Sequence, residues 1–151
     1  MIKNKNVFYT GGKGAGKSIH IKNTLRDFNG TVGGFVIVEY RIGGISGFIL
    51  RDRLTEKESL IGVRKDNGCI GITEAFETSG VIALENALNA NVDLIIMDEL
   101  GFLENEVVLF QQTVFACLDS EIPVVGALKL MSTPFLDAVR SRGDVVVIEV
   151  K

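Results

Sequence analysis

The sequence predicts an α/β domain with a mostly parallel sheet and helices on both of its faces. Short runs that are apolar throughout, such as residues 35–38 and 94–97, have the length of buried strands. Between such runs, apolar residues recur at helical spacing, as at Ile21, Leu25 and Phe28. Strands that are apolar on both faces and alternate with helices are typical of a parallel sheet covered on both sides.

The first half of the chain gives strands and one helix in alternation. Residues 7–9 are apolar or aromatic and are followed by glycines, which predicts a buried strand, and residues 35–38 predict the next one. A helix is expected from Lys17 to a stop at Asn29-Gly30. Gly43-Gly44 could turn the chain back into a hairpin with residues 48–50, and the charged residues 51–58 predict a loop.

The second half continues the alternation. One helix is expected from Thr73, and a second is expected to begin at the acidic residues Glu104 and Glu106. A short third helix is expected after Ser132-Thr133-Pro134. Strands are expected at residues 60–63, 69–72, 94–97 (ended by Asp98-Glu99), 122–127 and 145–150. With no internal repeat and no linker, residues 1–151 are interpreted as a single domain.

Composition excludes several classes of function. The chain has 151 residues and a net charge of −3, which argues against a broad basic surface for nucleic acid. Cys69 and Cys117 form no CxxC pair and no metal cluster with the single His20, as expected of reduced thiols in a cytoplasmic protein. No apolar run approaches 18 residues, so neither a membrane span nor a secretory signal is expected.

One motif carries specific chemistry. It runs Gly11, Gly12, Lys13, Gly14, Ala15, Gly16, Lys17, Ser18 and fits G-x-x-x-x-G-K-[ST] between a strand and a helix. Glycines allow backbone amides to surround a phosphate chain, and the following helix adds its positive end. Lys17 supplies a cation for the β- and γ-phosphates, and Ser18 offers a hydroxyl to Mg²⁺. These residues and Ile19 are the predicted nucleotide-binding set, with Mg²⁺ as cofactor.

A second candidate site follows the apolar strand at residues 94–97. In proteins with such a phosphate loop, an acid in the position of Asp98 holds Mg²⁺ beside the loop hydroxyl, and Glu99 would orient or deprotonate the attacking water. An ordinary strand end entering solvent is the alternative. Residues 98–101 also spell the GTPase pattern D-x-x-G, but the chain contains no N-K-x-D, which favours ATPases that keep a glutamate after the aspartate.

The chain resembles the thermophile-type nucleoside-triphosphatase family. The resemblance spans residues 7–18, 34–41 with its Glu39 and Arg41, 76–84, 96–101 and 139–145 in one colinear order. It implies a RecA-like P-loop fold and slow, Mg²⁺-dependent hydrolysis of nucleoside triphosphates to diphosphate and phosphate, with little base selectivity. Phe102 replaces a lysine of the family, and Ile45-Ser46 replaces basic residues, so the resemblance predicts slow hydrolysis or mainly nucleotide binding.

Further cations are candidates for the γ-phosphate. Arg41 is the predicted catalytic arginine because it follows a strand and matches the family segment; Arg140 and Arg142 are alternatives, and each is otherwise a surface charge. Lys129 follows a strand at the ligand-binding edge, where it could sense phosphate or be solvated. The remaining candidates are more simply explained as surface or packing residues; they are His20, Phe102, Leu103, Lys3 and Lys5.

Two other functions remain open from the sequence. A nucleotide or small-molecule kinase would use the same loop and need an acceptor pocket with a basic lid, for which Arg51 and Arg53 are candidates although acids flank them. A nucleotide-dependent switch or accessory subunit would bind ATP and ADP without turnover. The expected partner in every case is a nucleoside triphosphate, with no nucleic acid and no membrane span.

Overall fold

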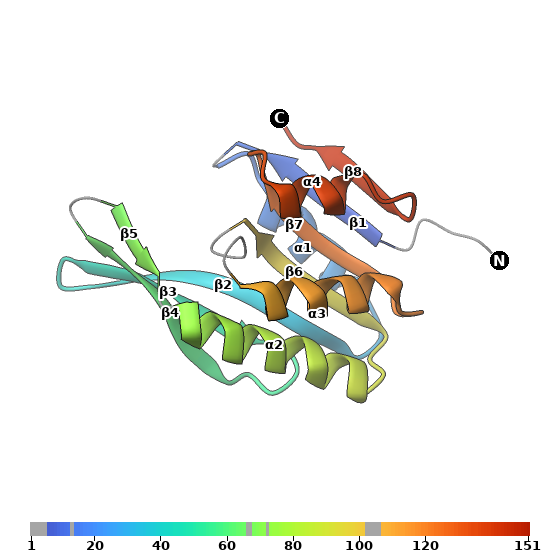
Figure 1. The fold of residues 1–151 in the computed structure, drawn as a ribbon, viewed down its shortest axis with the longest axis horizontal. Helices are drawn as coiled ribbons and strands as arrows, with labels where there is room; N and C mark the ends of the chain where they lie inside the picture. The colour runs from blue at the N-terminus through green and yellow to red at the C-terminus, as the bar shows by residue number, and fades with distance from the viewer. Residues whose placement is uncertain (1–5, 13, 66–67, 72, 102–106) are drawn as a thin grey trace.

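The computed structural model describes residues 6–12, 14–65, 68–71, 73–101 and 107–151. In these residues eight strands form one sheet in the order β5-β4-β3-β2-β6-β7-β1-β8 (Figure 1). The elements are β1 (Asn6–Gly11), α1 (Lys17–Arg26), β2 (Val32–Ile42), β3 (Ile45–Asp52), β4 (Glu58–Lys65), β5 (Gly68–Gly71), α2 (Thr73–Asn89), β6 (Leu94–Leu100), α3 (Val108–Asp119), β7 (Val124–Lys129), α4 (Pro134–Arg140) and β8 (Val145–Glu149). Strands β2, β6, β7, β1 and β8 run parallel, which confirms the predicted α/β class.

Helices cover both faces of the parallel part, as predicted. Neighbouring residues of β6 belong to opposite faces: Ile95 packs in the larger core with residues of α2, α3 and α4, whereas Ile96 packs with Ile21 of α1. Figure 1 shows α2, α3 and α4 on the near face and α1 behind the sheet. Burial on both sides explains why this strand carries no polar residue before Asp98.

The antiparallel strands extend beyond the rest of the sheet. Gly43 and Gly44 turn β2 back into β3, which confirms the expected hairpin, and β4 and β5 continue the antiparallel pairing. We call residues 38–65 and 68–71 the wing; Figure 1 shows its end at the β2–β3 turn projecting past the parallel strands. The predicted loop at residues 51–58 is shorter in the structure, because β3 continues to Asp52 and β4 already begins at Glu58.

The strand that carries the acidic pair is longer than the sequence suggests. β6 continues through Asp98 and Glu99 to Leu100, which pairs with Leu128 of β7, although the register shifts between Met97 and Leu100. The expectation that the strand stops at Met97 is therefore wrong, because pairing with a neighbouring strand sustains the extended backbone where apolar patterning has ended. The first helix ends at Arg26, a little before its predicted stop.

The helix after the acidic strand also begins later than expected. α3 starts at Val108, and its first turn contains no acid; the predicted opening residues Glu104 and Glu106 lie outside the described residues, as do Lys3, Lys5, Lys13, Phe102 and Leu103. The short helix α4 does follow its predicted signal, since Thr133 accepts a hydrogen bond from the Leu136 amide as N-cap and Pro134 comes next. No helix in the described ranges is long and apolar enough to cross a membrane.

Candidate functional site

The glycine-rich motif forms the connection between β1 and α1, as the sequence predicts. β1 ends at Gly11, and the helix begins at Lys17 with Gly16 as its N-cap. Gly14 and Gly16 have φ angles of 80° and 101°. This left-handed region is strained for residues with a Cβ, so the glycines let the loop bend closely round a ligand. The amides at the start of α1, which have no partner inside the helix, are available for an anion.

Lys17 joins the loop to the acidic strand. Its ammonium donates to the carbonyl oxygen of Gly11 at 2.9 Å and lies 2.7 Å from Oε2 of Glu99. That carboxylate oxygen is buried and has no hydrogen bond of good geometry among the described residues. Its charge is therefore offset by the ion pair with Lys17. The arrangement brings together the predicted phosphate-binding lysine and the predicted base.

Ser18 and Asp98 form the second link between the same two elements. The Ser18 hydroxyl donates to Oδ1 of Asp98 at 3.3 Å. Burial raises the pKa of Asp98 above its ordinary value of 3.8, and the charge of Glu99 adds to this, while the Ser18 hydrogen bond and Lys17 oppose it. A hydroxyl and a carboxylate are oxygen ligands of the kind that hard divalent cations take.

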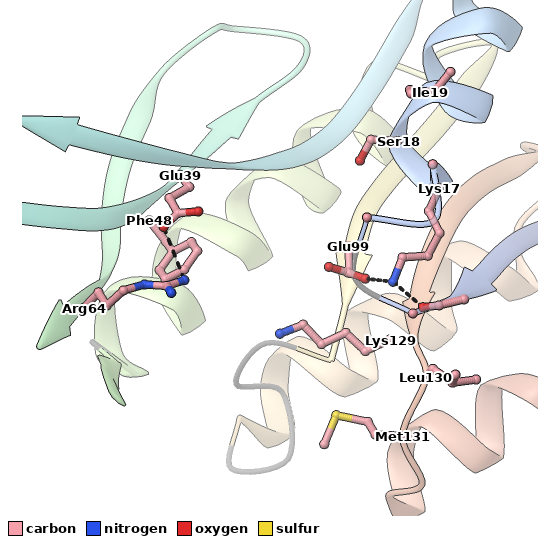
Figure 2. A pocket seen from close by; sticks show the side chains of 14 residues that line it. Lys17, Ser18, Ile19, Glu39, Phe48, Arg64, Glu99, Lys129, Leu130 and Met131 are labelled. Atoms are coloured by element: carbon pink, nitrogen blue, oxygen red, sulfur yellow. Dashed lines mark hydrogen bonds and ion pairs between the residues drawn. The ribbon is translucent and has the colours of Figure 1, made fainter. Parts of the chain in front are cut away.

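A cavity of about 660 Å³ opens in front of the glycine loop (Figure 2). The loop, Glu99, the end of β7 and the wing all contribute to its wall. The lining residues are Gly11, Gly12, Gly14, Gly16, Lys17, Ser18, Ile19, Glu39, Phe48, Arg64, Glu99, Lys129, Leu130 and Met131. A smaller cavity of about 150 Å³ is lined by Ser18, Ile37, Glu39, Phe48, Asp98, Glu99 and Lys129. The loop and both acids therefore face space large enough for a triphosphate and its surroundings.

The wing supplies a wall that sequence reasoning missed. The guanidinium of Arg64 lies 3.2 Å from Oε2 of Glu39 and stacks over the Phe48 ring at 5.4 Å from its centroid. Figure 2 shows these three side chains facing the loop across the cavity. The available signal was the alternation along β2, because Ile37 and Glu39 project from one face of the strand.

The end of β7 is held in place by an arginine from α4. One terminal nitrogen of Arg140 donates to the carbonyl oxygens of Lys129 and Met131, each at 2.7 Å. The other lies 2.9 Å from Oδ1 of Asp137. Leu130 and Met131 are exposed and line the larger cavity, although the sequence singled out only Lys129 in this segment.

The arginine candidates occupy different environments. Arg41 is 78% exposed, lies 4.0 Å from Glu39 and is not among the cavity residues, so its catalytic role remains a sequence prediction that the geometry does not support. Arg142 lies 2.6 Å from Asp119 and 2.8 Å from Asp144, which raise its pKa, and it serves as a structural ion pair. His20 is exposed and stacks on the Tyr9 ring at 4.9 Å, which agrees with a packing role.

Comparison with known proteins agrees with this geometry. The family model described as NTPase matches residues 6–151. Nucleoside-triphosphatase THEP1 of Thermotoga maritima is 31% identical over 155 residues, covering 95% of this chain and 84% of the relative. The protein of the same name from Methanocaldococcus jannaschii is 32% identical over 132 residues, covering 81% and 76% respectively.

Two solved structures share the fold. The crystal structure of THEP1 from Aquifex aeolicus superimposes with a TM-score of 0.79 at 21% identity, covering 96% of this chain and 89% of that one. The solution structure of a human cancer-related nucleoside triphosphatase gives 0.73 at 24% identity, covering 97% and 89%. The match spans nearly the whole chain and includes both the glycine loop and the acidic strand. The chain therefore belongs to the THEP1-type nucleoside-triphosphatase family, as its sequence motifs predict.

Proposed function

We propose that this protein hydrolyses nucleoside triphosphates to diphosphate and phosphate in a Mg²⁺-dependent reaction. The observation that carries the proposal is the pair of links between the glycine loop and β6, Lys17 with Glu99 and Ser18 with Asp98. These links bring a phosphate cradle, a pair of metal ligands and a carboxylate base to one wall of the cavity. Matched relatives are named nucleoside-triphosphatase, which supports the same reaction.

The residues present fit a magnesium ion. Mg²⁺ in nucleotide sites is held by one or two protein oxygens together with phosphate oxygens and water, rather than by an all-protein cage. Ser18 and Asp98 provide such a pair, and no cluster of three or more potential His, Cys, Asp or Glu ligands occurs among the residues described. Ser18 and Asp98 would hold the ion, which would supply positive charge to offset the charge of the phosphate groups.

Glu99 is the proposed general base. Its carboxylate lies at the cavity wall, next to the ammonium that would contact the β- and γ-phosphates. In this role Glu99 orients a water molecule in line with the γ-phosphorus and accepts its proton as the bond to the β-phosphate oxygen breaks. Lys17 and the amides of the glycine loop hold the phosphate chain while this occurs.

Broad base specificity and slow turnover complete the proposal. Ile19, Leu130 and Met131 are exposed apolar residues at the cavity. Apolar contact with a base does not distinguish one hydrogen-bonding edge from another, which supports low selectivity. The sequence departures at Ile45-Ser46 and Phe102 support slow hydrolysis. A cytoplasmic location is part of the proposal, supported by the cysteine usage and by the burial of Cys117 in the core.

Phosphate release with Mg²⁺ and ATP, GTP, CTP or UTP tests this function. The wild-type protein is expected to release phosphate slowly from all four, whereas Lys17→Ala and Glu99→Gln should each reduce the rate by at least about 10²-fold. Lys57→Ala, in an exposed turn of the wing, is the matched control for loss of a lysine. Equal rates for wild type and Glu99→Gln contradict the base assignment, and no release above a buffer blank contradicts the hydrolase.

Phosphoryl transfer to an acceptor is the second candidate, because the larger cavity continues past the loop to Phe48 and Arg64 of the wing. A hydrolase needs only water at this position. With an acceptor present, diphosphate should then form in excess of released phosphate. Equal amounts of the two products across a panel of nucleosides and nucleoside monophosphates favour hydrolysis.

A further inference from the structure

Lys129 lies between the two strands that carry the proposed machinery. In the register of the sheet it is opposite Gly11, the first glycine of the loop, while the preceding Leu128 is opposite Leu100 of β6. β7 separates β1 from β6 in the sheet. Lys129 therefore ends the strand that stands between the phosphate loop and the acidic pair, at the edge where ligands bind in open α/β sheets.

The stem of Lys129 packs against the backbone at Gly101, the residue that follows β6. A Cβ built on Gly101 would lie 2.8 Å, 2.9 Å and 3.2 Å from Cβ, Cγ and Cδ of Lys129, so the aliphatic chain covers this glycine. Figure 2 shows the side chain extending from β7 with its ammonium directed to the space between Glu99 and the wing. The contact with Gly101 thus sets the direction in which the charge points.

The acidic lining of the smaller cavity explains why a cation is needed at the position of Lys129. Its lining includes the carboxylates of Glu39, Asp98 and Glu99, with Lys129 as the ammonium among its lining residues. Arg64 already pairs with Glu39, and a γ-phosphate would compete with Glu99 for Lys17, so an approaching phosphate would meet repulsion from these acids unless a further cation stood beside it. Lys17 lines the larger cavity from the loop side, whereas Lys129 lines both cavities from the end of β7.

The backbone at Lys129 is anchored from outside the cavity. Arg140 donates to the carbonyl oxygens of Lys129 and Met131 and is itself held by Asp137. Since the strand end is fixed by these bonds and the stem by Gly101, a smaller part of the side chain remains to be ordered on ligand binding. Preorganised cations are the ones that stabilise developing charge most effectively.

From these observations we infer that Lys129 is a second catalytic cation, which contacts the γ-phosphate from the side opposite Lys17, and that Arg140 is its positioning residue. The inference rests on the proposed function, because it requires a nucleoside triphosphate in the cavity. It also distinguishes triphosphate from diphosphate: a cation at the γ-position contributes to binding ATP and not to binding ADP. Arg41, which is exposed and outside the cavity lining, is not needed for this task.

The test compares binding of ADP with binding of a non-hydrolysable imido analogue of ATP, both with Mg²⁺, by calorimetry. Lys129→Gln removes the charge but keeps a stem that can cover Gly101, Lys129→Arg keeps the charge, and Lys57→Gln is the matched control. For Lys129→Gln we expect the dissociation constant of the analogue to rise about tenfold or more and the ATPase rate to fall on the order of 10²-fold, with ADP binding within about twofold of wild type. Lys129→Arg should recover part of both losses.

Each outcome decides the assignment. If Lys129→Gln binds the analogue as tightly as wild type, or weakens ADP and the analogue equally, Lys129 is not a γ-phosphate contact although the hydrolase stands. If the wild-type protein binds neither nucleotide, the proposed function fails and the assignment fails with it. Circular dichroism and thermal unfolding of each variant separate a folding defect from these results, and the charge-retaining arginine variant supplies the comparison if the glutamine variant unfolds.

Discussion

One ammonium joins the two halves of the site: Nζ of Lys17 lies 2.7 Å from Oε2 of Glu99 and 2.9 Å from the Gly11 carbonyl oxygen. Both side chains are largely shielded from solvent, with exposed fractions of 13% and 27%. In the proposed reaction, an entering phosphate competes with Glu99 for this cation, so nucleotide binding also releases the base from its ion pair.

Glu99→Gln should separate binding from hydrolysis. The amide leaves the loop and β6 in place but has no charge to compete with phosphate for Lys17, so nucleotide binding should remain or become tighter. Turnover should fall on the order of 10²–10⁴-fold because the base is lost. Equilibrium binding of ATP and single-turnover hydrolysis measure the two effects, and Glu56→Gln in the wing is a control for loss of a surface carboxylate. Parallel loss of binding and turnover contradicts this prediction.

Asp98→Asn should stabilise the metal-free protein at neutral pH while it removes activity. Burial raises the pKa of Asp98 in the folded state. Between 3.8 and that raised pKa the folded protein binds more protons than the unfolded chain, so the free energy of unfolding falls as pH rises through this window. Above this pH window the ionised, buried Asp98 destabilises the folded protein by a constant amount. Below the window Asp98 is protonated in both states, and this destabilisation is absent.

Urea unfolding across this pH range measures the effect. The difference in unfolding free energy between Asp98→Asn and wild type should grow as pH rises and then level off. Asp27→Asn, at the exposed end of α1, controls for the loss of one acidic charge. A difference that stays constant with pH, or that shrinks as pH rises, contradicts the assigned direction.

Gly11→Ala should destabilise the fold, whereas Gly12→Ala should not. A Cβ on Gly11 would stand 2.5 Å from the carbonyl oxygen of Val150 and 3.1 Å from Cβ of Ala15. The backbone after β8 and the glycine loop would therefore have to move away from Gly11. A Cβ on the exposed Gly12 meets nothing within 4 Å. Overpacking of this kind costs about 1–3 kcal/mol. Thermal unfolding measures both variants, and equal melting temperatures refute the steric explanation.

Arg142→Ala should reduce stability without reducing hydrolysis. Its guanidinium bridges Asp119, at the end of α3, and Asp144, before β8. Because Asp119 is largely exposed, we expect a loss of about 1 kcal/mol rather than the cost of a buried pair. Denaturant unfolding measures this loss, and kcat/KM for ATP should stay within about twofold of wild type. A large fall in kcat/KM with stability retained instead supports a phosphate-binding role for Arg142.

The sequence identified the glycine loop and the acidic strand because each depends on local chemistry. Gly14 and Gly16 have the left-handed backbone that favours glycine, and the role predicted for Lys17 depends on the charge of a phosphate, so both requirements leave a pattern within eight residues. The capping signal at Thr133-Pro134 was equally local and is confirmed. The strand end at Met97 was misjudged because β6 is prolonged by pairing with β7, a contact between residues far apart in the chain.

The wing wall and the status of the arginines were beyond local patterning. Glu39, Phe48 and Arg64 come from three strands and meet only because β2, β3 and β4 pair side by side in the sheet. Arg41 follows Glu39 by two residues and shares its side of β2, but it lies farther along the wing, where its side chain is solvated. A pattern that assigns a face to a strand does not say how far along that strand the cavity ends.

By itself, the sequence determined that the chain folds as a layered α/β domain with a glycine-rich loop after its first strand and an acidic pair on a later one, since periodicity and short-range backbone chemistry encode both. Only the tertiary structure decided which charged groups share the cavity. Long-range strand pairing places Lys129 and Glu39 there, and the fold brings Asp119 within 2.6 Å of Arg142 away from the cavity, because the energy of a charge depends on its neighbours in space as well as in sequence.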